Sequence, residues 1–577
     1  MSWLFGVIGS RVTVKDLPRY HTVHDKHLFQ NFKEHSHYFA CGGNTQTCFS
    51  ENTPDNSSFW IGLGIAIQSD PHQAAILSPL GWNALVQNVD GVSKQNGHFI
   101  IVTYANNTFE IRTDTLGLRT MYWKQNEDEI ILSTRIDWIS RYCNGLEIDY
   151  QSTGSRWLLV NQLSYQSLAK NTHRLGPQGK LTIHNGSVTS YQQPYTPSVN
   201  NTVFSKKNMT DCLLSYLTPQ HQDLKQITLG LSGGLDSRVL LSFLMGSHRK
   251  NYQTHTFGHI LDPDVAIPKR IAEKEHFPHF IFQTAISSTQ QLAHLVQSYA
   301  SETNLVEPIS TALRLQNIAS LDPAKYIMID GGYGEIARRQ YLNKLAFYGK
   351  KPFRNQNIDL LFRHLYVQRG NFLHRDIFKQ MHIGARNDIS TMLNTMPAIG
   401  EISLENYLDL WAIRSRFPNF GSDEQARLDK QILNFMPFAQ LDFVNMVFTM
   451  PVALRRNGRL FRDLIKMNFP VLSNYPLVKS GMTYPFQLST KTSWLYTKIK
   501  SKLGFQYVEN HIDLFLELMK DYTLDLLYSK NVQEHPAYNY QYIRTVIEQY
   551  YRGDTTLKTE VVWWLTFELW RKGIEQK

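Results

Sequence analysis

The chain has 577 residues, of which 42% are hydrophobic and 19% charged, a balance that fills two or three globular cores and excludes a disordered chain. The net charge of +10 fits a mildly basic enzyme, because the lysines and arginines are scattered and form no basic run typical of nucleic-acid binding. Four cysteines without a CxxC pair exclude a disulfide scaffold and argue against a zinc site, which agrees with a reducing cytoplasm.

No segment has the pattern of a targeting peptide or a membrane span. The apolar opening Met1–Val7 is short, lacks a basic flank and soon meets Arg11. The apolar stretch Val561–Trp570 is interrupted by Glu568 and predicts a buried terminal helix. A polar, loop-rich face is expected for the early histidines, whose spacing matches no metal site: His21, His24, His27, His35 and His37. We therefore expect a cytoplasmic protein with no membrane span and no nucleic-acid partner.

Residues 1–195 are predicted to be rich in β-strands. Turn signals at Asn106-Asn107 and Asn185-Gly186 separate short apolar runs. These runs are Phe59–Ile67, Phe99–Tyr104, Phe109–Arg112, Ile130–Ser133 and Lys180–His184. The polar stretch Thr196–Thr202 then marks a linker.

Residues 205–577 follow a different pattern, with helical periodicity and occasional buried strands. Ile227–Leu231 and Tyr326–Ile329 are two such strands. This pattern predicts an α/β arrangement near the start of the region and mostly helices toward its end.

The most specific signal is Ser232-Gly233-Gly234-Leu235-Asp236-Ser237, between the apolar run that ends at Leu231 and the helical run Arg238–Leu244. A loop in this place meets the free amides and the dipole of a helix N-terminus, which attract anions. Its glycines let the backbone approach a ligand, its serines add hydroxyl donors, and Asp236 can hold Mg²⁺ against phosphate oxygens. The pattern is neither a Walker loop nor GxGxxG, and it predicts a nucleotide site from Leu231 to Ser237. A merely glycine-rich strand-to-helix turn is the alternative.

This hexapeptide resembles the pyrophosphate-binding loop of N-type ATP pyrophosphatases, and its neighbours resemble the asparagine synthetase family. Thr254–Gly258 resembles the strand that lines the adenine pocket of that family, which implies a nucleotide contact for Gly258. Met436-Pro437-Phe438, Leu441-Asp442 and Met450-Pro451 resemble its helical region. Lys479-Ser480-Gly481-Met482 resembles its Lys-x-Gly-Phe, where the lysine meets the phosphates, so the resemblance implies a catalytic role for Lys479.

One loop departs from the family pattern. The family carries Ser-Gly-Glu-Gly-x-Asp-Glu after its third strand, whereas this chain has Asp330-Gly331-Gly332-Tyr333-Gly334-Glu335. Gly331 and Gly332 stay candidates for the nucleotide site, but Gly334 replaces the metal-binding aspartate. Asp330 or Glu335 could then supply the second metal ligand beside Asp236. The alternative is that this loop closes over the substrate and binds no metal.

Residues 97–138 resemble the class II glutamine amidotransferase domain of the same family. The matching segments are Gly97–Phe99, Arg112–Tyr122 and Leu132–Ile136, and the opening Met1–Val7 resembles Met-Cys-Gly-Ile-Phe-Gly. In active members the second residue is a cysteine that attacks glutamine, whereas here it is Ser2. A hydroxyl is a weaker nucleophile unless a base such as the N-terminal amine activates it, and no Asn-Gly-Glu segment is present to build a glutamine pocket. The prediction is an inactive amidotransferase site, with Ser2 as the alternative nucleophile.

The resemblance implies an α+β and α/β chain of two domains. Residues 1–195 would form an Ntn-hydrolase-like β-sandwich of the class II glutamine amidotransferase type. Residues 205–577 would form an α/β ATP-pyrophosphatase domain with a helical C-terminal part.

The implied activity is an ATP-dependent, amide-forming ligase that uses ATP and Mg²⁺. A small-molecule or peptide carboxylate would be activated as an acyl-adenylate and passed to ammonia or an amine, and a homodimer stays open. Two alternatives remain: a glutamine-hydrolysing asparagine synthetase, and a catalytically dead scaffold or binding protein.

Overall fold

The computed structural model describes residues 2–9, 28–32, 37–53, 57–70, 73–88, 90–197, 203–221, 225–247, 251–283, 289–339, 341–342, 345, 350–507 and 511–576. Four of the early histidines, His21, His24, His27 and His35, lie outside this part of the chain, as do residues 198–202 of the expected linker.

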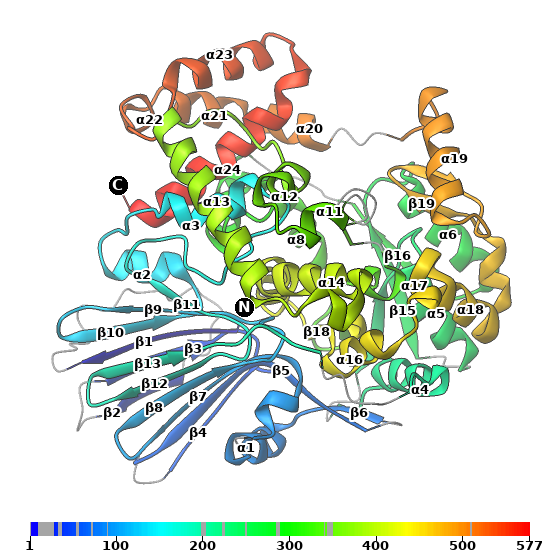
Figure 1. The fold of residues 1–577 in the computed structure, drawn as a ribbon, viewed down its shortest axis with the longest axis horizontal. Coiled ribbons are helices and arrows are strands. Elements are labelled where there is room, and N and C mark those ends of the chain that lie inside the picture. The colour runs from blue at the N-terminus through cyan, green and yellow to red at the C-terminus, as the bar shows by residue number, and fades with distance from the viewer. Residues whose placement is uncertain are drawn as a thin grey trace.

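Two antiparallel sheets form the N-terminal part (Figure 1). The first has the order β11-β9-β10-β1-β3-β2, with bounds Trp3–Gly9 (β1), Leu28–Phe32 (β2), His37–Gly42 (β3), Met121–Gln125 (β9), Glu129–Ser133 (β10) and His173–Leu175 (β11). The second has the order β13-β12-β8-β7-β5-β4, with β6 paired to β5. Its bounds are Cys48–Asn52 (β4), Phe59–Asp70 (β5), Gln73–Ile76 (β6), Asn96–Ala105 (β7), Thr108–Thr113 (β8), Lys180–His184 (β12) and Ser187–Tyr191 (β13). The five strands expected from apolar runs in this region are therefore confirmed.

The expected turn residues close two of the hairpins. Asn106 and Asn107 join β7 to β8 with φ of 51° and 59°, and Asn185 and Gly186 join β12 to β13 with φ of 48° and 77°. Two consecutive positive φ angles are the geometry that two-residue hairpins prefer, because their twist matches that of the strands.

Alternation along β1 shows how the first sheet is buried on both faces. Leu4 and Ile8 belong to the core between the two sheets, whereas Phe5 and Val7 belong to a second core shared with helices. That second core also takes residues from the C-terminal helix, among them Trp564 and Trp570. The sheet thus lies between the second sheet and a helical layer.

A third sheet begins the second half of the chain and is entirely parallel. Its order is β16-β15-β14-β17-β18, with bounds Gln226–Gly230 (β14), Tyr252–Phe257 (β15), His279–Phe282 (β16), Tyr326–Ile329 (β17) and Asn434–Phe435 (β18). The predicted strands at 227–231 and 326–329 are confirmed as β14 and β17. The strand order reverses between β14 and β17. Open α/β sheets bind ligands at such a switch point, beside the carboxyl ends of the strands.

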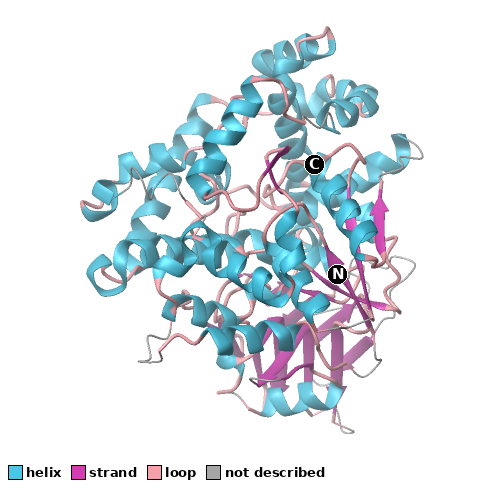
Figure 2. Cartoon of the chain, turned by 90° about the vertical axis from the view of Figure 1, so that its right-hand side faces the viewer, coloured by secondary structure: helices cyan, strands magenta, loops and turns pink. Residues whose placement is uncertain are grey.

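Helices make up most of the remaining described structure (Figure 2). Those that follow or flank the parallel sheet are Lys206–Tyr216 (α4), Asp236–Gly246 (α5), Pro263–Glu275 (α6), Glu335–Arg338 (α9), Leu441–Thr449 (α16), Val452–Arg455 (α17) and Arg459–Asn468 (α18). Others are Pro79–Gln87 (α1), Ile136–Tyr142 (α2), Tyr150–Leu158 (α3), Thr289–Thr303 (α7), Ala312–Ile318 (α8), Lys350–Arg354 (α11), Ile358–Leu365 (α12), Arg375–Thr395 (α13), Ile399–Arg416 (α14) and Ser422–Leu428 (α15). The last are Thr490–Lys502 (α19), His511–Leu518 (α20), Lys520–Leu527 (α21), Lys530–Gln533 (α22), Tyr540–Tyr551 (α23) and Lys558–Glu575 (α24).

The C-terminal helix α24 is buried, as its apolar pattern predicted. Among the described residues, none of the helices combines the length and the apolar character needed to cross a bilayer.

Helices α3 and α13 join the two halves of the chain through glycines. A Cβ added at Gly154 would lie 2.1 Å from the carbonyl oxygen of Met381, and one added at Gly384 would lie 2.0 Å from that of Gln151. Both distances are shorter than atoms can approach, so the two backbones pack this closely only because the side chains are absent.

Gly384→Ala should therefore separate α3 from α13 and lower the free energy of unfolding by about 1–3 kcal/mol, as overpacking typically does. Gly400→Ala in α14 is the matched control, since an added Cβ there meets nothing within 4 Å. Urea unfolding of both variants tests this, and equal stabilities would contradict it.

Candidate functional site

A cavity of about 950 Å³ opens at the switch point of the parallel sheet. Its walls include almost all of the predicted nucleotide, metal and catalytic residues: Leu231, Ser232, Gly234, Leu235, Asp236, Ser237, Gly258, Asp330, Gly331, Gly332, Glu335 and Lys479. Gly233 lies in the same loop, where its carbonyl accepts a hydrogen bond from the amide of Val478 at 2.9 Å. Segments more than 240 residues apart in sequence thus meet around one space.

Two serines fix the shape of the loop after β14. The Ser232 amide donates to the Ser237 hydroxyl at 3.1 Å, and the two hydroxyl oxygens are also 3.1 Å apart. The Gly234 amide donates to the Ser232 hydroxyl at 3.2 Å. The loop is therefore folded back on the first turn of α5, whose N-terminal amides favour an anion.

The loop after β17 packs directly against the Ser232–Ser237 loop. A Cβ at Gly331 would lie 2.7 Å from the amide nitrogen of Ser237, and a Cβ at Gly334 would lie 2.5 Å from the Asp236 carboxyl carbon. The glycines at these two positions are required by contact between the loops, a requirement that the sequence pattern alone did not show.

Lys479 reaches the site from a short hairpin formed by β19 (Leu477–Lys479) and β20 (Met482–Tyr484). Ser480 and Gly481 turn the chain with φ of 51° and 70°. The side chain lines the cavity. Partial burial there, together with the nearby Arg338, lowers the pKa of Lys479.

Sequence reasoning missed the residue that holds this hairpin in place. Arg238 is fully buried and donates to the carbonyls of Tyr475 and Pro476, both at 2.8 Å, and to that of Gly233 at 3.2 Å. It joins the Ser232–Ser237 loop to the segment that leads into Lys479. A charged residue inside an otherwise apolar helical run was the available signal.

Asp236 faces a cation, and that cation is an arginine. Arg338 Nη2 donates to Oδ2 of Asp236 at 2.5 Å, while Nε lies 2.5 Å from Oδ1 without hydrogen-bond alignment. Burial raises the pKa of Asp236 to about 6, and the charges of Glu335 and Asp330 contribute in the same direction while Arg338 opposes it.

The predicted metal ligands Asp236, Asp330 and Glu335 do not form a metal site by themselves. Within the described part of the chain, no group of three or more His, Cys, Asp or Glu side chains could hold a metal ion. Asp236 is paired with Arg338, and Asp330 Oδ1 accepts the Gly332 amide at 2.6 Å. The predicted ligand set therefore stays a prediction. In this structure Gly334 brings no carboxylate, and Arg338, one turn later, supplies positive charge beside Asp236.

The strands beside β14 shape another wall of the cavity. Gly258 follows β15 with φ of 132°, and its amide donates to the Phe282 carbonyl at 3.1 Å. The Gly233 amide donates to Asp264 Oδ1 at 3.1 Å. His255 is buried with its Nδ1 2.8 Å from the Thr228 hydroxyl, and burial lowers its pKa to about 3, so it stays neutral.

Aromatic rings and charges line a further part of the cavity. The Arg416 guanidinium lies over the rings of Tyr333, Tyr341 and Phe420, at 5.7, 5.4 and 4.7 Å from their centroids. Its Nε has no hydrogen-bond acceptor among the described residues. Burial raises the pKa of Glu424 to about 8, with further contributions from Glu307 and Asp330, so this carboxyl is neutral near pH 7.

Ser2 does not belong to this site. It has no exposed surface, and Arg119 donates to both its hydroxyl and, at 3.1 Å, its carbonyl. Arg119 also lies 3.4 Å from Asp429, whose other oxygen is 3.0 Å from His98 Nε2. These buried groups form a polar bridge from the sandwich to residue 429, beside the parallel sheet.

No family model and no curated protein matches this chain. Among solved structures, it is similar to the glutamine phosphoribosylpyrophosphate amidotransferase from B. subtilis complexed with ADP and GMP, at 10% identity over 58% of this chain and 77% of that chain, with a TM-score of 0.23. A structure described as the allosteric regulatory enzyme of purine biosynthesis gives 10% identity, 60% and 77% coverage, and a TM-score of 0.22. Similarity at this level supports no conclusion about activity.

Ser2→Ala should remove one hydrogen bond to a buried charge and lower the free energy of unfolding by about 1–2 kcal/mol. It should leave any reaction in the cavity unchanged, since Ser2 does not line the cavity. The wild-type protein should release no glutamate from glutamine. Glutamine hydrolysis that the Ser2→Ala variant loses would contradict this expectation.

Proposed function

We propose that this chain is an ATP-dependent, amide-forming ligase. In the first step, an oxygen of the substrate carboxylate attacks the α-phosphorus of ATP, the bond to the bridging oxygen breaks, and pyrophosphate leaves. In the second step, the lone pair of an amine or ammonia attacks the acyl carbon, AMP leaves with the electrons of the C–O bond, and the nitrogen loses a proton.

The observation that carries this proposal is the meeting of two loops and one hairpin at the switch point. The serine- and glycine-rich loop after β14 opens a helix, the loop after β17 packs on it, and the Lys479 hairpin is hydrogen-bonded to Gly233. Such an edge is where α/β sheets bind nucleotides, and a helix N-terminus there suits a polyphosphate.

The cations in the cavity suit the charge that this reaction develops. Arg338, Arg462 and Lys479 all line it, and burial, together with the charge of Arg338, lowers the pKa of both Arg462 and Lys479. Such mutual repulsion is relieved when an anion binds among them. In the proposal, Arg338 and Arg462 contact the pyrophosphate, Lys479 stabilises charge on the α-phosphate and on the acyl oxygen, and Asp236 positions Arg338.

Magnesium stays a prediction. Cellular ATP carries Mg²⁺ on its phosphates, and such complexes need only one or two protein carboxylates. Asp330 and Glu335 are the carboxylates of the predicted set that no ion pair engages among the described residues.

The arginine among aromatic rings supports a carboxylate as substrate. A planar guanidinium binds a carboxylate with two parallel hydrogen bonds, and Arg416 lines the same cavity as the phosphate loop. In the proposal, Arg416 binds the acyl substrate and the neutral Glu424 adds a hydrogen-bond donor.

The burial of Ser2 favours ammonia or a substrate amine as the nitrogen donor. A glutamine-hydrolysing asparagine synthetase would need a nucleophile that glutamine can reach, and Ser2 has no exposed surface. A scaffold without activity would have no need for Arg338, Arg462 and Lys479 to converge on a large cavity. ATP–pyrophosphate exchange measured across a panel of carboxylates tests the proposal and identifies the substrate, and absence of exchange throughout the panel would favour the scaffold.

Asp236→Ala should abolish pyrophosphate exchange, by at least about 10²-fold, because Arg338 loses the group that positions it. Asp322→Ala is the control, since this exposed aspartate precedes β17, at the end of that strand opposite to Asp330 and the cavity. Exchange in the wild type should also decline as the pH falls through about 6, where Asp236 takes up a proton and its pairing with Arg338 is lost. Undiminished pyrophosphate exchange in a normally folded Asp236→Ala variant would contradict the role of Asp236 in positioning Arg338.

Lys479→Ala and Lys479→Arg should both bind ATP nearly as the wild type does but lose about 10²–10³-fold in product formation. Arginine at this position should not restore product formation, because its wide planar guanidinium cannot take the place of a compact ammonium. Lys325→Ala, at an exposed position at the opposite end of β17, should change neither quantity. Calorimetric ATP titration and single-turnover assays separate binding from chemistry, and wild-type turnover in Lys479→Ala would refute the role.

A further inference from the structure

Helix α19 presents its large apolar side chains to solvent. Trp494, Leu495 and Ile499 are 55%, 54% and 52% exposed, whereas the residues that it buries are Ser493 and Thr497, at 2% and 5%. A surface helix normally does the reverse, since burying apolar side chains stabilises the fold. The apolar surface continues past the helix with Leu503 and Phe505, which are 65% and 67% exposed.

The same segment is strongly basic. From residue 464 to residue 508 the chain has no aspartate or glutamate, and it has six lysines: Lys466, Lys479, Lys491, Lys498, Lys500 and Lys502. Lys498 Nζ lies 4.8 Å from the centroid of the Trp494 ring, and Lys500 Nζ lies 5.4 Å from that of Tyr496. Positive charge and exposed aromatic surface are thus interleaved on one helix.

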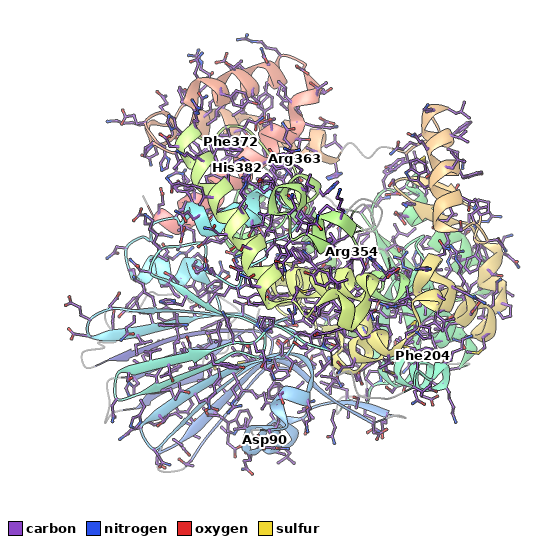
Figure 3. All side chains as sticks on the ribbon, in the orientation of Figure 1. Asp90, Phe204, Arg354, Arg363, Phe372 and His382 are labelled. Carbon is purple, nitrogen blue, oxygen red and sulfur yellow. The ribbon has the colours of Figure 1, made fainter. Side chains whose placement is uncertain are left out.

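This helix stands beside the opening of the cavity. Ser493 of α19 lines the cavity, and so do Leu514 and Leu518 of α20, which are also 65% and 39% exposed. Figure 1 shows α19 projecting from the edge of the molecule, and Figure 3 shows side chains extending from it on the side away from the body. The apolar, basic surface and the mouth of the cavity therefore adjoin.

We propose that α19, with the following residues 503–505 and the exposed leucines of α20, docks on an anionic lipid bilayer. An interfacial helix of this kind inserts its apolar and aromatic side chains at the level of the headgroups, while lysines contact the acidic lipids. Residues 490–505 carry each of these features: exposed Trp, Tyr, Leu and Ile side chains, lysines among them, and no acidic residue. On α20 the exposed leucines lie near Asp513, which pairs with Lys558, and near the exposed Glu517.

A bilayer fits this surface better than a second copy of the chain does. Two copies packed through α19 would bring the lysines of both segments together without a carboxylate between them, and like charges at such an interface repel. An anionic bilayer offers both the apolar layer and the opposite charge.

One consequence rests on the proposed function. With α19 on a bilayer, the mouth of the cavity faces the headgroup region, so the carboxylate or the amine would belong to a molecule held at the membrane surface. Loss of membrane binding would leave ATP–pyrophosphate exchange with a water-soluble carboxylate intact, so failure of one proposal is distinguishable from failure of the other.

Co-sedimentation of the full chain with vesicles tests the docking. The wild type should bind vesicles of mixed phosphatidylglycerol and phosphatidylcholine, bind pure phosphatidylcholine more weakly, and lose affinity in high salt. The double variant Trp494→Glu, Ile499→Glu should lower the affinity by about tenfold or more, since two apolar anchors are lost. The control Leu80→Glu changes a leucine of α1 that is even more exposed, at 82%, in the N-terminal part of the chain, and should bind as the wild type does.

Two outcomes would overturn the docking proposal. The first is a wild type that does not bind the anionic vesicles, or a double variant that binds them as well as the wild type does. The second is a concentration-dependent dimer in sedimentation velocity that the double variant abolishes, together with no vesicle binding, which would assign the surface to a second copy. Circular dichroism and melting of each variant establish that it is folded.

Discussion

The candidate site depends on one buried guanidinium. Arg238 lies in the first turn of α5, directly after the Ser232–Ser237 loop, and its hydrogen bonds within the described part of the chain all go to main-chain carbonyls. Because burial of a charge is costly without partners, these carbonyls are held where the guanidinium needs them. Two belong to the segment before β19 and one to Gly233, so the same side chain fixes the loop and the approach of the Lys479 hairpin.

A second constraint is the balance of charge around Asp236. A carboxylate that burial alone would neutralise is kept beside Arg338, and the glycine at 334 leaves the space that their contact occupies. An aspartate at 334 would place a second negative charge against the first. Gly334 and the arginine one helical turn later therefore act together to set the electrostatics of this loop.

The N-terminal sandwich is tied to the rest of the chain by packing and by buried charge. The helical core takes side chains from β1 and from α24, at opposite ends of the sequence, and the glycines of α3 and α13 let those helices meet closely. Arg119, which is hydrogen-bonded to Ser2 and lies beside Asp429, adds a buried polar contact between the sandwich and the second half of the chain. Such an interface suits a sandwich that supports the second half of the chain.

Local sequence determined the strands, the hairpin turns and the loop–helix junction, because alternation, paired asparagines and the Gly-Gly turn act within a few residues. It could therefore place Ser232–Ser237 on a helix N-terminus and single out Lys479 by resemblance. It could not show that Arg338 pairs with Asp236 or that Arg238 joins two distant segments, since those partners meet only through strand order. The outward face of α19 was equally hidden, because a periodic pattern of apolar residues does not say which side meets the body. Tertiary packing decided that, by turning Ser493 and Thr497 inward.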